Sequence, residues 1–133
     1  LKFIEIKPGD QFVVQGITVL TASGKHIIED VAYRIGDICY TGDTAPSDYI
    51  VNLATGSKLL IHEASGLAEN EGFLQGVGHS SSRQAGQIAS RAKVEKLLLS
   101  HITPAVSNKE NELLNQAKSE FSNVEIAEDL LAF

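Results

Sequence analysis

The stretch Ile38-Cys39-Tyr40-Thr41-Gly42-Asp43 is a short apolar run that ends on an acidic residue. Two later runs follow the same pattern: residues 59–63 end on a glutamate and residues 97–101 end on a histidine. Each run has the length of a buried strand, and a helix-like pattern follows it. Strands joined through helices lie parallel, and open α/β sheets bind ligands at the carboxyl ends of such strands. We therefore expect one edge of the sheet to carry Asp43, Glu63 and His101.

The rest of the chain predicts a β-meander followed by a β-α-β-α-β arrangement. Apolar segments separated by Pro-Gly, Ser-Gly and Gly-Asp turns predict strands over 3–6, 12–14, 17–21, 31–35 and 38–41. Beyond them, an apolar spacing of about 3.6 residues predicts helices over 47–53, 81–92 and 107–121, with strands over 59–62, 97–101 and 124–127 between them. The predicted N-cap residues of the helices are Ser47, Ser81 and Ser107. No repeat or linker divides residues 1–133, so we expect a single α+β domain.

The composition is that of a globular protein, with 43% apolar residues, 21% charged residues and a net charge of −6. An acidic chain without clusters of Lys and Arg removes the usual electrostatic argument for nucleic-acid binding, although it does not exclude it. No apolar run approaches the ~20 residues of a membrane helix, and no signal-peptide pattern opens the chain. The single Cys39 lies inside a predicted strand. We expect a buried thiol and a cytoplasmic protein.

One connection is much longer than usual. About sixteen residues, rich in glycine, separate the strand over 59–62 from the next helix, whereas ordinary connections of this kind take about 2–6 residues. This loop has to return to the carboxyl ends of the strands before its helix begins, and His79 lies at that return. Ser80 and Ser81 follow at the start of the helix, where backbone N–H groups can hold an anion such as phosphate. We expect these two serines to contact substrate.

Two histidines and an aspartate can hold a catalytic metal ion with one position open to water, and water bound there becomes a nucleophile near neutral pH. A glutamate that orients a histidine creates a proton donor, which suits Glu63 and His79. Structural interpretations compete with these. Asp43 could instead be a helix cap or turn residue. His101 could be a hydrogen-bonded residue at a strand end, and His79 could be an ordinary loop residue. His62 points to the face opposite Glu63, so we interpret it as structural.

Several segments resemble motifs of the metallo-β-lactamase superfamily, most closely its tRNase Z-like branch. Residues 26–35 resemble the segment in which a ligand histidine precedes a strand, and residues 41–44, Thr-Gly-Asp-Thr, resemble the GDT motif. Residues 60–65, 78–81 and 99–101 match later motifs in order and spacing. The resemblance covers most of the chain and implies the carboxyl-terminal half of an αββα sandwich.

The resemblance also implies roles for individual residues. His26 and His101 would be ligands of different metal ions, Asp43 would bridge the ions, and Glu63 with His79 would handle protons. The implied cofactor is a pair of zinc ions, with manganese as an alternative. The implied activity is that of a metal-dependent hydrolase, either a phosphodiesterase or a ribonuclease-like enzyme, because the branch cuts the 3′ trailer from tRNA precursors.

Two departures from the family pattern refine this expectation. The superfamily signature H-x-H-x-D-H belongs to the amino-terminal half and is absent from these 133 residues. We therefore expect that this chain alone is inactive and that it pairs with the missing half, or with a second copy, through an exposed sheet face. The residues after His101 lack the Arg-Tyr pair of tRNase Z, so a general phosphodiesterase is the safer prediction. The alternatives are a non-catalytic structural or regulatory half-fold and a metal-free phosphate-binding domain.

Overall fold

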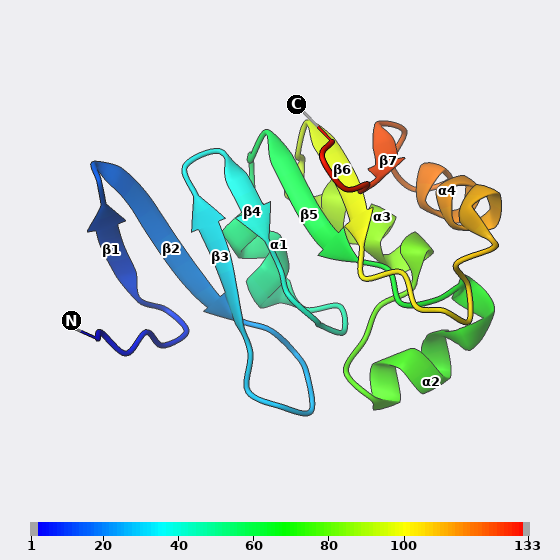
Figure 1. Cartoon of the computed structure of the whole chain (residues 1–133), viewed down its shortest axis with the longest axis horizontal. Helices are drawn as coiled ribbons and strands as arrows, with labels where there is room; N and C mark the ends of the chain where they lie inside the picture. The colour runs from blue at the N-terminus through cyan, green and yellow to red at the C-terminus, as the bar shows by residue number, and fades with distance from the viewer. Residues whose placement is uncertain (1–2, 132–133) are drawn as a thin grey trace.

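The computed structural model describes residues 3–131 and contains one mixed sheet of seven strands, arranged in chain order (Figure 1). The strands are β1 Gln11–Val14, β2 Ile17–Ser23, β3 Val31–Ile35, β4 Ile38–Tyr40, β5 Leu59–Glu63, β6 Lys96–Ser100 and β7 Val124–Ile126. β1 to β4 pair antiparallel, and β4 to β7 pair parallel. The predicted meander followed by β-α-β units is confirmed.

Two-residue turns connect the outer strands of the meander. Gln15 and Gly16 join β1 to β2 with φ angles of 50° and 83°, the left-handed values that a tight hairpin with right-handed twist requires. Gly36 joins β3 to β4 with a φ of 58°. These turns fix the strand register. As a result Cys39 points toward the core, where it is fully buried, and burial raises the pKa of its thiol to about 12.

The helices are α1 Asp48–Ala54, α2 Glu71–Gly76, α3 Ser82–Ala92 and α4 Glu110–Lys118, with a 3₁₀ turn η1 at Ala68–Asn70. The hydroxyl of Ser47 accepts from the Ile50 N–H at 3.3 Å and begins α1 as predicted. At α3 the Gln84 N–H donates to the Ser81 hydroxyl at 3.1 Å, and the Ser81 N–H donates to the Gln84 side chain at 3.0 Å. This reciprocal capping box confirms the predicted start of α3.

The core lies between the sheet and the helices. Its largest fully buried apolar side chains include Ile50, Leu60, Ile88, Leu97, Leu99 and Leu113. Burying side chains of this size contributes about 1.5–3 kcal/mol each. At Gly86 on α3, a Cβ would lie 2.6 Å from the Ala117 carbonyl oxygen of α4. The absence of a side chain therefore lets these two helices approach each other closely. Residues 3–131 contain no candidate membrane-spanning helix.

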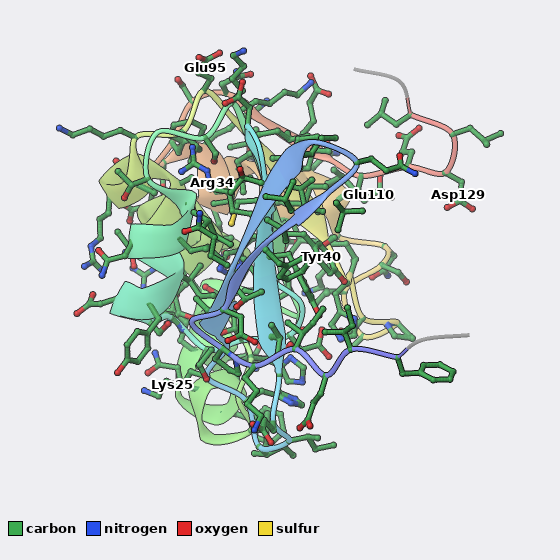
Figure 2. All side chains as sticks on the ribbon, turned by 90° about the vertical axis from the view of Figure 1, so that its left-hand side faces the viewer. Lys25, Arg34, Tyr40, Glu95, Glu110 and Asp129 are labelled. Atoms are coloured by element: carbon green, nitrogen blue, oxygen red, sulfur yellow. The ribbon has the colours of Figure 1, made fainter. Side chains whose placement is uncertain are left out.

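The opposite face of the sheet carries no helix among the described residues. Figure 2 shows α1 and Arg34 on one side of the sheet and Tyr40 on the other. Side chains that alternate with the buried ones point to this open face, and several of them are 45–51% exposed: Val14, Ile17, Ile35, Ile38 and Tyr40. We call these five residues the open apolar face.

Three sequence predictions are wrong. Residues 3–6 form no strand; the turn that follows them is closed by the Lys7 N–H, which donates to the Asp10 carboxylate at 2.8 Å. The long connection after β5 is not a plain loop, because it contains η1 and α2. The third helix begins at Glu110 rather than at Ser107, since the Ser107 hydroxyl donates to the Pro104 carbonyl and caps nothing. The same helix ends at Lys118 rather than at residue 121.

These caps generate a stability test. Ser81→Ala should lower the free energy of unfolding by about 1–2 kcal/mol, because the first turn of α3 loses its hydroxyl acceptor. Ser107→Ala is the matched control and should change stability by less than ~0.5 kcal/mol, because its hydroxyl caps no helix. Urea denaturation followed by circular dichroism measures both. Equal losses for the two variants would contradict the assigned caps.

Candidate metal centre

The carboxyl ends of three adjacent parallel strands meet at one edge of the sheet, below β4, β5 and β6 in Figure 1. Asp43 follows β4 after Thr41 and Gly42, Glu63 is the last residue of β5, and His101 directly follows β6. Two connections reach the same edge: the one between β2 and β3 brings His26, and the one between α2 and α3 brings His79. We call this region the carboxyl edge.

The imidazole rings at the carboxyl edge lie close to one another and to Asp43. One nitrogen or oxygen donor atom each from His26, Asp43 and His79 lies within 4.8 Å of the other two. His101 Nδ1 lies 3.6 Å from Asp43 Oδ1, and the His101 ring stacks on the His79 ring with centroids 5.5 Å apart. The structure therefore brings together every predicted metal and proton-handling residue, including His26, which only the family resemblance suggested.

Glu63 connects the parts of the carboxyl edge through its buried carboxylate, which is 1% exposed. Oε1 accepts from the Thr44 N–H at 2.6 Å and from His79 Nδ1 at 2.9 Å, and Oε2 accepts from the Ser65 hydroxyl at 2.6 Å. Because a carboxylate oxygen only accepts, the bond to His79 places the proton on Nδ1. Nε2 is then the nitrogen of His79 that remains available to bind a cation or exchange a proton.

The backbone at the carboxyl edge adopts conformations that most residues avoid. Gly42 and Gly78 have φ angles of 64° and 85°, and His101 has a φ of 52° although it carries a side chain. A Cβ at Gly78 would lie 2.7 Å from His26 Cα, so the glycine lets the two connections touch. Left-handed conformations at residues other than glycine cost about 1–3 kcal/mol and cluster at functional sites.

Sequence reasoning missed Asp30, which lies beneath the carboxyl edge. Its carboxylate packs against Gly24 and Gly42, and a Cβ at either glycine would come within 2.6 Å or 3.0 Å of it. Burial raises the pKa of Asp30 above its ordinary value, and Oδ2 has no hydrogen-bond partner among residues 3–131. The sequence carried no signal for this position, because a connection between antiparallel strands gives no rule for which of its residues turns inward.

The hydroxyls of Ser80 and Ser81, two residues that we expected to contact substrate, are used within the protein. Both residues are fully buried. The Ser80 hydroxyl donates to the Thr44 carbonyl at 2.6 Å, and the Ser81 hydroxyl donates to the Glu71 carboxylate at 2.7 Å. These bonds tie the start of α3 to the loop after β4 and to α2. The two serines therefore shape the site from within the protein.

His62 lies on the helix side of β5 and is fully buried. Its Nδ1 donates to the Glu63 carbonyl at 2.8 Å, so this nitrogen carries the proton in the neutral ring. Burial lowers the pKa of His62 by disfavouring the charged form. These contacts agree with the structural interpretation of His62. Its side chain packs on the helix side of β5, near the end of the strand.

The donor atoms at the carboxyl edge fit a divalent metal ion. Imidazole nitrogen and carboxylate oxygen are the ligands that zinc takes in catalytic sites, which typically use three protein ligands and leave one position open. His26, Asp43 and His79 offer donor atoms of these two types within 4.8 Å of one another, and His101 lies beside Asp43 as a further donor. The unpartnered Oδ2 atom of Asp30 lies buried beneath this set.

Comparison with known proteins identifies the family. Residues 1–102 match the family model described as the Beta-lactamase superfamily domain. Ribonuclease Z of Archaeoglobus fulgidus is 38% identical over 95 residues, which cover 71% of this chain and 31% of that protein. Ribonuclease Z of Methanothermobacter thermautotrophicus is 34% identical, with 95% of this chain and 42% of that protein covered. The chain thus spans less than half the length of these curated relatives.

Solved structures share the fold. The metallo-β-lactamase fold protein YhfI from Bacillus subtilis is 30% identical with a TM-score of 0.86, and the alignment covers 96% of this chain and 53% of that one. Human tRNase Z, short form, has a TM-score of 0.71 at 24% identity, and the alignment covers 90% of this chain and 42% of that one. At that identity the second likeness supports the fold alone. The chain belongs to the metallo-β-lactamase superfamily, corresponds to about half of its fold, and has Ribonuclease Z proteins among its relatives.

Proposed function

We propose that the protein to which this chain belongs is a zinc-dependent phosphodiesterase that acts on RNA-like substrates. The observation that carries the proposal is the position of His79, which lies among the donor atoms of the metal centre and is held by the buried Glu63 at 2.9 Å. A metal-ligand cluster beside a glutamate–histidine pair combines the two parts that hydrolysis of a phosphodiester needs. Membership of the superfamily and the Ribonuclease Z relatives support the choice of reaction.

In this proposal His26 and His101 would hold zinc as ligands of different ions, and Asp43 would be the ligand that they share. When bound, such ions lower the pKa of water and offset the negative charge of the phosphoryl group. Manganese has related ligand preferences and is the alternative ion. The chain contributes only part of the ligand set, because zinc in catalytic sites normally takes three protein ligands per ion. We infer that residues outside this chain complete the coordination of both ions.

His79 handles the proton of the leaving group. In hydrolysis, a bond forms between a water oxygen and phosphorus while that water releases one proton to solvent. The bond from phosphorus to the leaving oxygen breaks, that oxygen takes a proton from Nε2 of His79, and His79 then regains a proton from solvent. The carboxylate of Glu63 accepts the Nδ1 hydrogen bond throughout and stabilises the charged imidazolium before transfer. Thr44 and Ser65 also donate to Glu63. These two hydrogen bonds restrict the orientation of the Glu63 carboxylate.

The substrate is proposed as a general phosphodiester of the RNA type rather than as a tRNA precursor. The sequence after His101 continues Ile102-Thr103-Pro104 and lacks the Arg-Tyr pair expected of a tRNA-processing enzyme. With a net charge of −6, the chain does not favour the extended binding of a large, negatively charged RNA. Both features favour a short or compact substrate.

Two variants separate metal binding from proton transfer. In the full-length protein with zinc, Asp43→Ala should abolish hydrolysis of bis-p-nitrophenyl phosphate and lower the bound zinc, because the shared ligand is lost. For a substrate with a poor leaving group, such as a dinucleotide, His79→Ala should retain zinc and slow turnover by roughly 10²–10⁴-fold. Elemental analysis and steady-state kinetics measure the two effects. Zinc loss in His79→Ala equal to that in Asp43→Ala would make His79 a ligand instead.

The 133-residue chain by itself should bind zinc weakly. Because it provides only part of the proposed ligand set, its affinity should fall roughly 10–100-fold or more below that of the full-length protein. Isothermal titration calorimetry with zinc compares the two directly. Tight binding of two ions by the isolated chain would show that its own residues complete the centre.

We also propose that the open apolar face packs against the remaining part of the protein or against a second copy. Val14, Ile17, Ile35, Ile38 and Tyr40 are each about half exposed on one sheet face, and exposed apolar patches beyond a few hundred Å² usually mark an interface. The sandwich architecture of the superfamily supports the same expectation, because the chain spans about half of the matching solved structure.

Light scattering tests this face. The isolated chain should associate at high concentration, and Ile38→Glu should reduce that association because it places a charge in the apolar patch. Lys58→Glu is the control, since Lys58 is exposed and pairs with Asp37 outside the patch. A wild-type chain that stays monomeric at high concentration would contradict the proposal.

A further inference from the structure

A second cavity opens beside the metal centre, and the proposed function does not use it. It has a volume of about 390 Å³ and lies between α2 and the connection that follows β6, which run next to each other in Figure 1. We call it the α2 pocket. Its lining includes His79, Phe73, Leu74, Val77, Ala105 and Val106. His79 therefore belongs to both the α2 pocket and the metal centre.

The α2 pocket has the chemistry of a site for a flat, weakly polar group. Besides His79, no ionisable side chain among the described residues lines it. Its volume lies within the range of about 300–1,000 Å³ that is typical of small-molecule sites, and its walls are mainly apolar. This lining does not suit a second phosphate. It suits the part of a substrate that carries no charge.

The Phe73 side chain indicates which kind of flat group the α2 pocket binds. The residue lines the pocket, yet it is 71% exposed, so most of its ring has no protein neighbour. Nucleobases stack on exposed aromatic rings of this kind. Asn70 lies at the same pocket, and its exposed amide offers both a donor and an acceptor, the combination that reads the edge of a base.

The walls of the α2 pocket are held in place by polar contacts. Glu71 at the start of α2 receives two bonds from the Arg83 guanidinium, at 3.0 Å and 2.7 Å. The His79 N–H donates to the Leu74 carbonyl at 2.8 Å, and the Thr103 hydroxyl donates to the Ser65 carbonyl at 2.8 Å. Both walls are thus fixed to the elements that carry Glu63 and His79. A preformed pocket loses little free energy in ordering itself around a ligand.

We propose that the α2 pocket binds the nucleobase of the nucleoside that leaves during hydrolysis. The assignment rests on the proposed function, because it uses His79 as the proton donor to the leaving oxygen. A group that receives its proton from His79 has to lie on the His79 side of the phosphorus, and the α2 pocket is the cavity there. Phe73 stacks on the base and Asn70 contacts its edge. The site thereby favours substrates whose leaving group is a nucleoside over those that release a small alcohol.

The experiment uses nucleosides as product analogues on the full-length protein with zinc. Cytidine and adenosine should bind and should inhibit hydrolysis of bis-p-nitrophenyl phosphate, whereas ribose should do neither. Binding is followed separately by NMR, where the amide signals of residues 70–77 and 103–106 should shift. Phe73→Ala should weaken nucleoside binding roughly 5- to 100-fold, the effect of losing one stacked base. Phe3→Ala, which removes another exposed ring that does not line the pocket, should leave binding unchanged.

The outcomes separate this inference from the proposed function. Hydrolysis without nucleoside binding, or binding that Phe73→Ala leaves intact, overturns the pocket assignment while the phosphodiesterase stands. Equal binding of ribose and cytidine also overturns it, because the base then contributes nothing. Nucleoside binding at these amides without any hydrolysis supports the pocket and overturns the phosphodiesterase. Phe73→Leu adds a control for bulk: it should weaken binding nearly as much as alanine if stacking on the ring is the cause.

Discussion

The buried carboxylate of Glu63 is the constraint on which the carboxyl edge depends. A carboxylate that is 1% exposed is strongly destabilising unless hydrogen-bond donors surround it, and here the Thr44 N–H, the Ser65 hydroxyl and His79 Nδ1 all donate to it. These donors come from three separate connections. Satisfying one charge therefore fixes the loop after β4, the turn after β5 and the start of α3 relative to one another. Ser80 adds a further bond to the Thr44 carbonyl and completes the link.

The same network sets the chemistry of the metal centre. Glu63 accepts the Nδ1 proton of His79, which leaves Nε2 without that bond, and His79 lies in one cluster with His26 and Asp43. Gly78 and Gly42 let the backbone pass close to His26 and Asp30, so the donor atoms converge although they come from different connections. The strained backbone of His101, with a φ of 52°, brings a fourth residue to the cluster. Stability and site geometry thus have a common origin in the packing of these connections.

Much of this architecture could be predicted from the sequence because it follows from strong local rules. The parallel order of β4, β5 and β6 follows from their crossover connections, which is why Asp43, Glu63 and His101 could be assigned to one edge. The capping box at Ser81 has a four-residue signature of its own. His26 had no such rule, since a connection between antiparallel strands can meet either edge, and only the family resemblance pointed to it.

Features that depend on tertiary contacts escaped prediction. The α2 helix has six residues, including two glycines, so its sequence shows no helical period; Glu71 holds it in place through Arg83 and Ser81. Ser80 and Ser81 look like loop residues available to a substrate, yet the packing of α2 and the loop after β4 buries them. Asp30 becomes significant only because Gly24 and Gly42 lie against it. In each case the deciding neighbour is distant in sequence.

We propose that the carboxyl edge is a two-metal hydrolytic centre with His79 outside the ligand set. Anomalous diffraction at the zinc absorption edge, on crystals of the full-length protein grown with zinc, tests it most directly. We expect two zinc peaks that share the Asp43 carboxylate at about 2.0–2.2 Å, with His26 and His101 on different ions and His79 Nε2 bound to neither. A single zinc held by His26, Asp43 and His79 would contradict the division of roles, and the absence of zinc from this edge would contradict the metal centre itself.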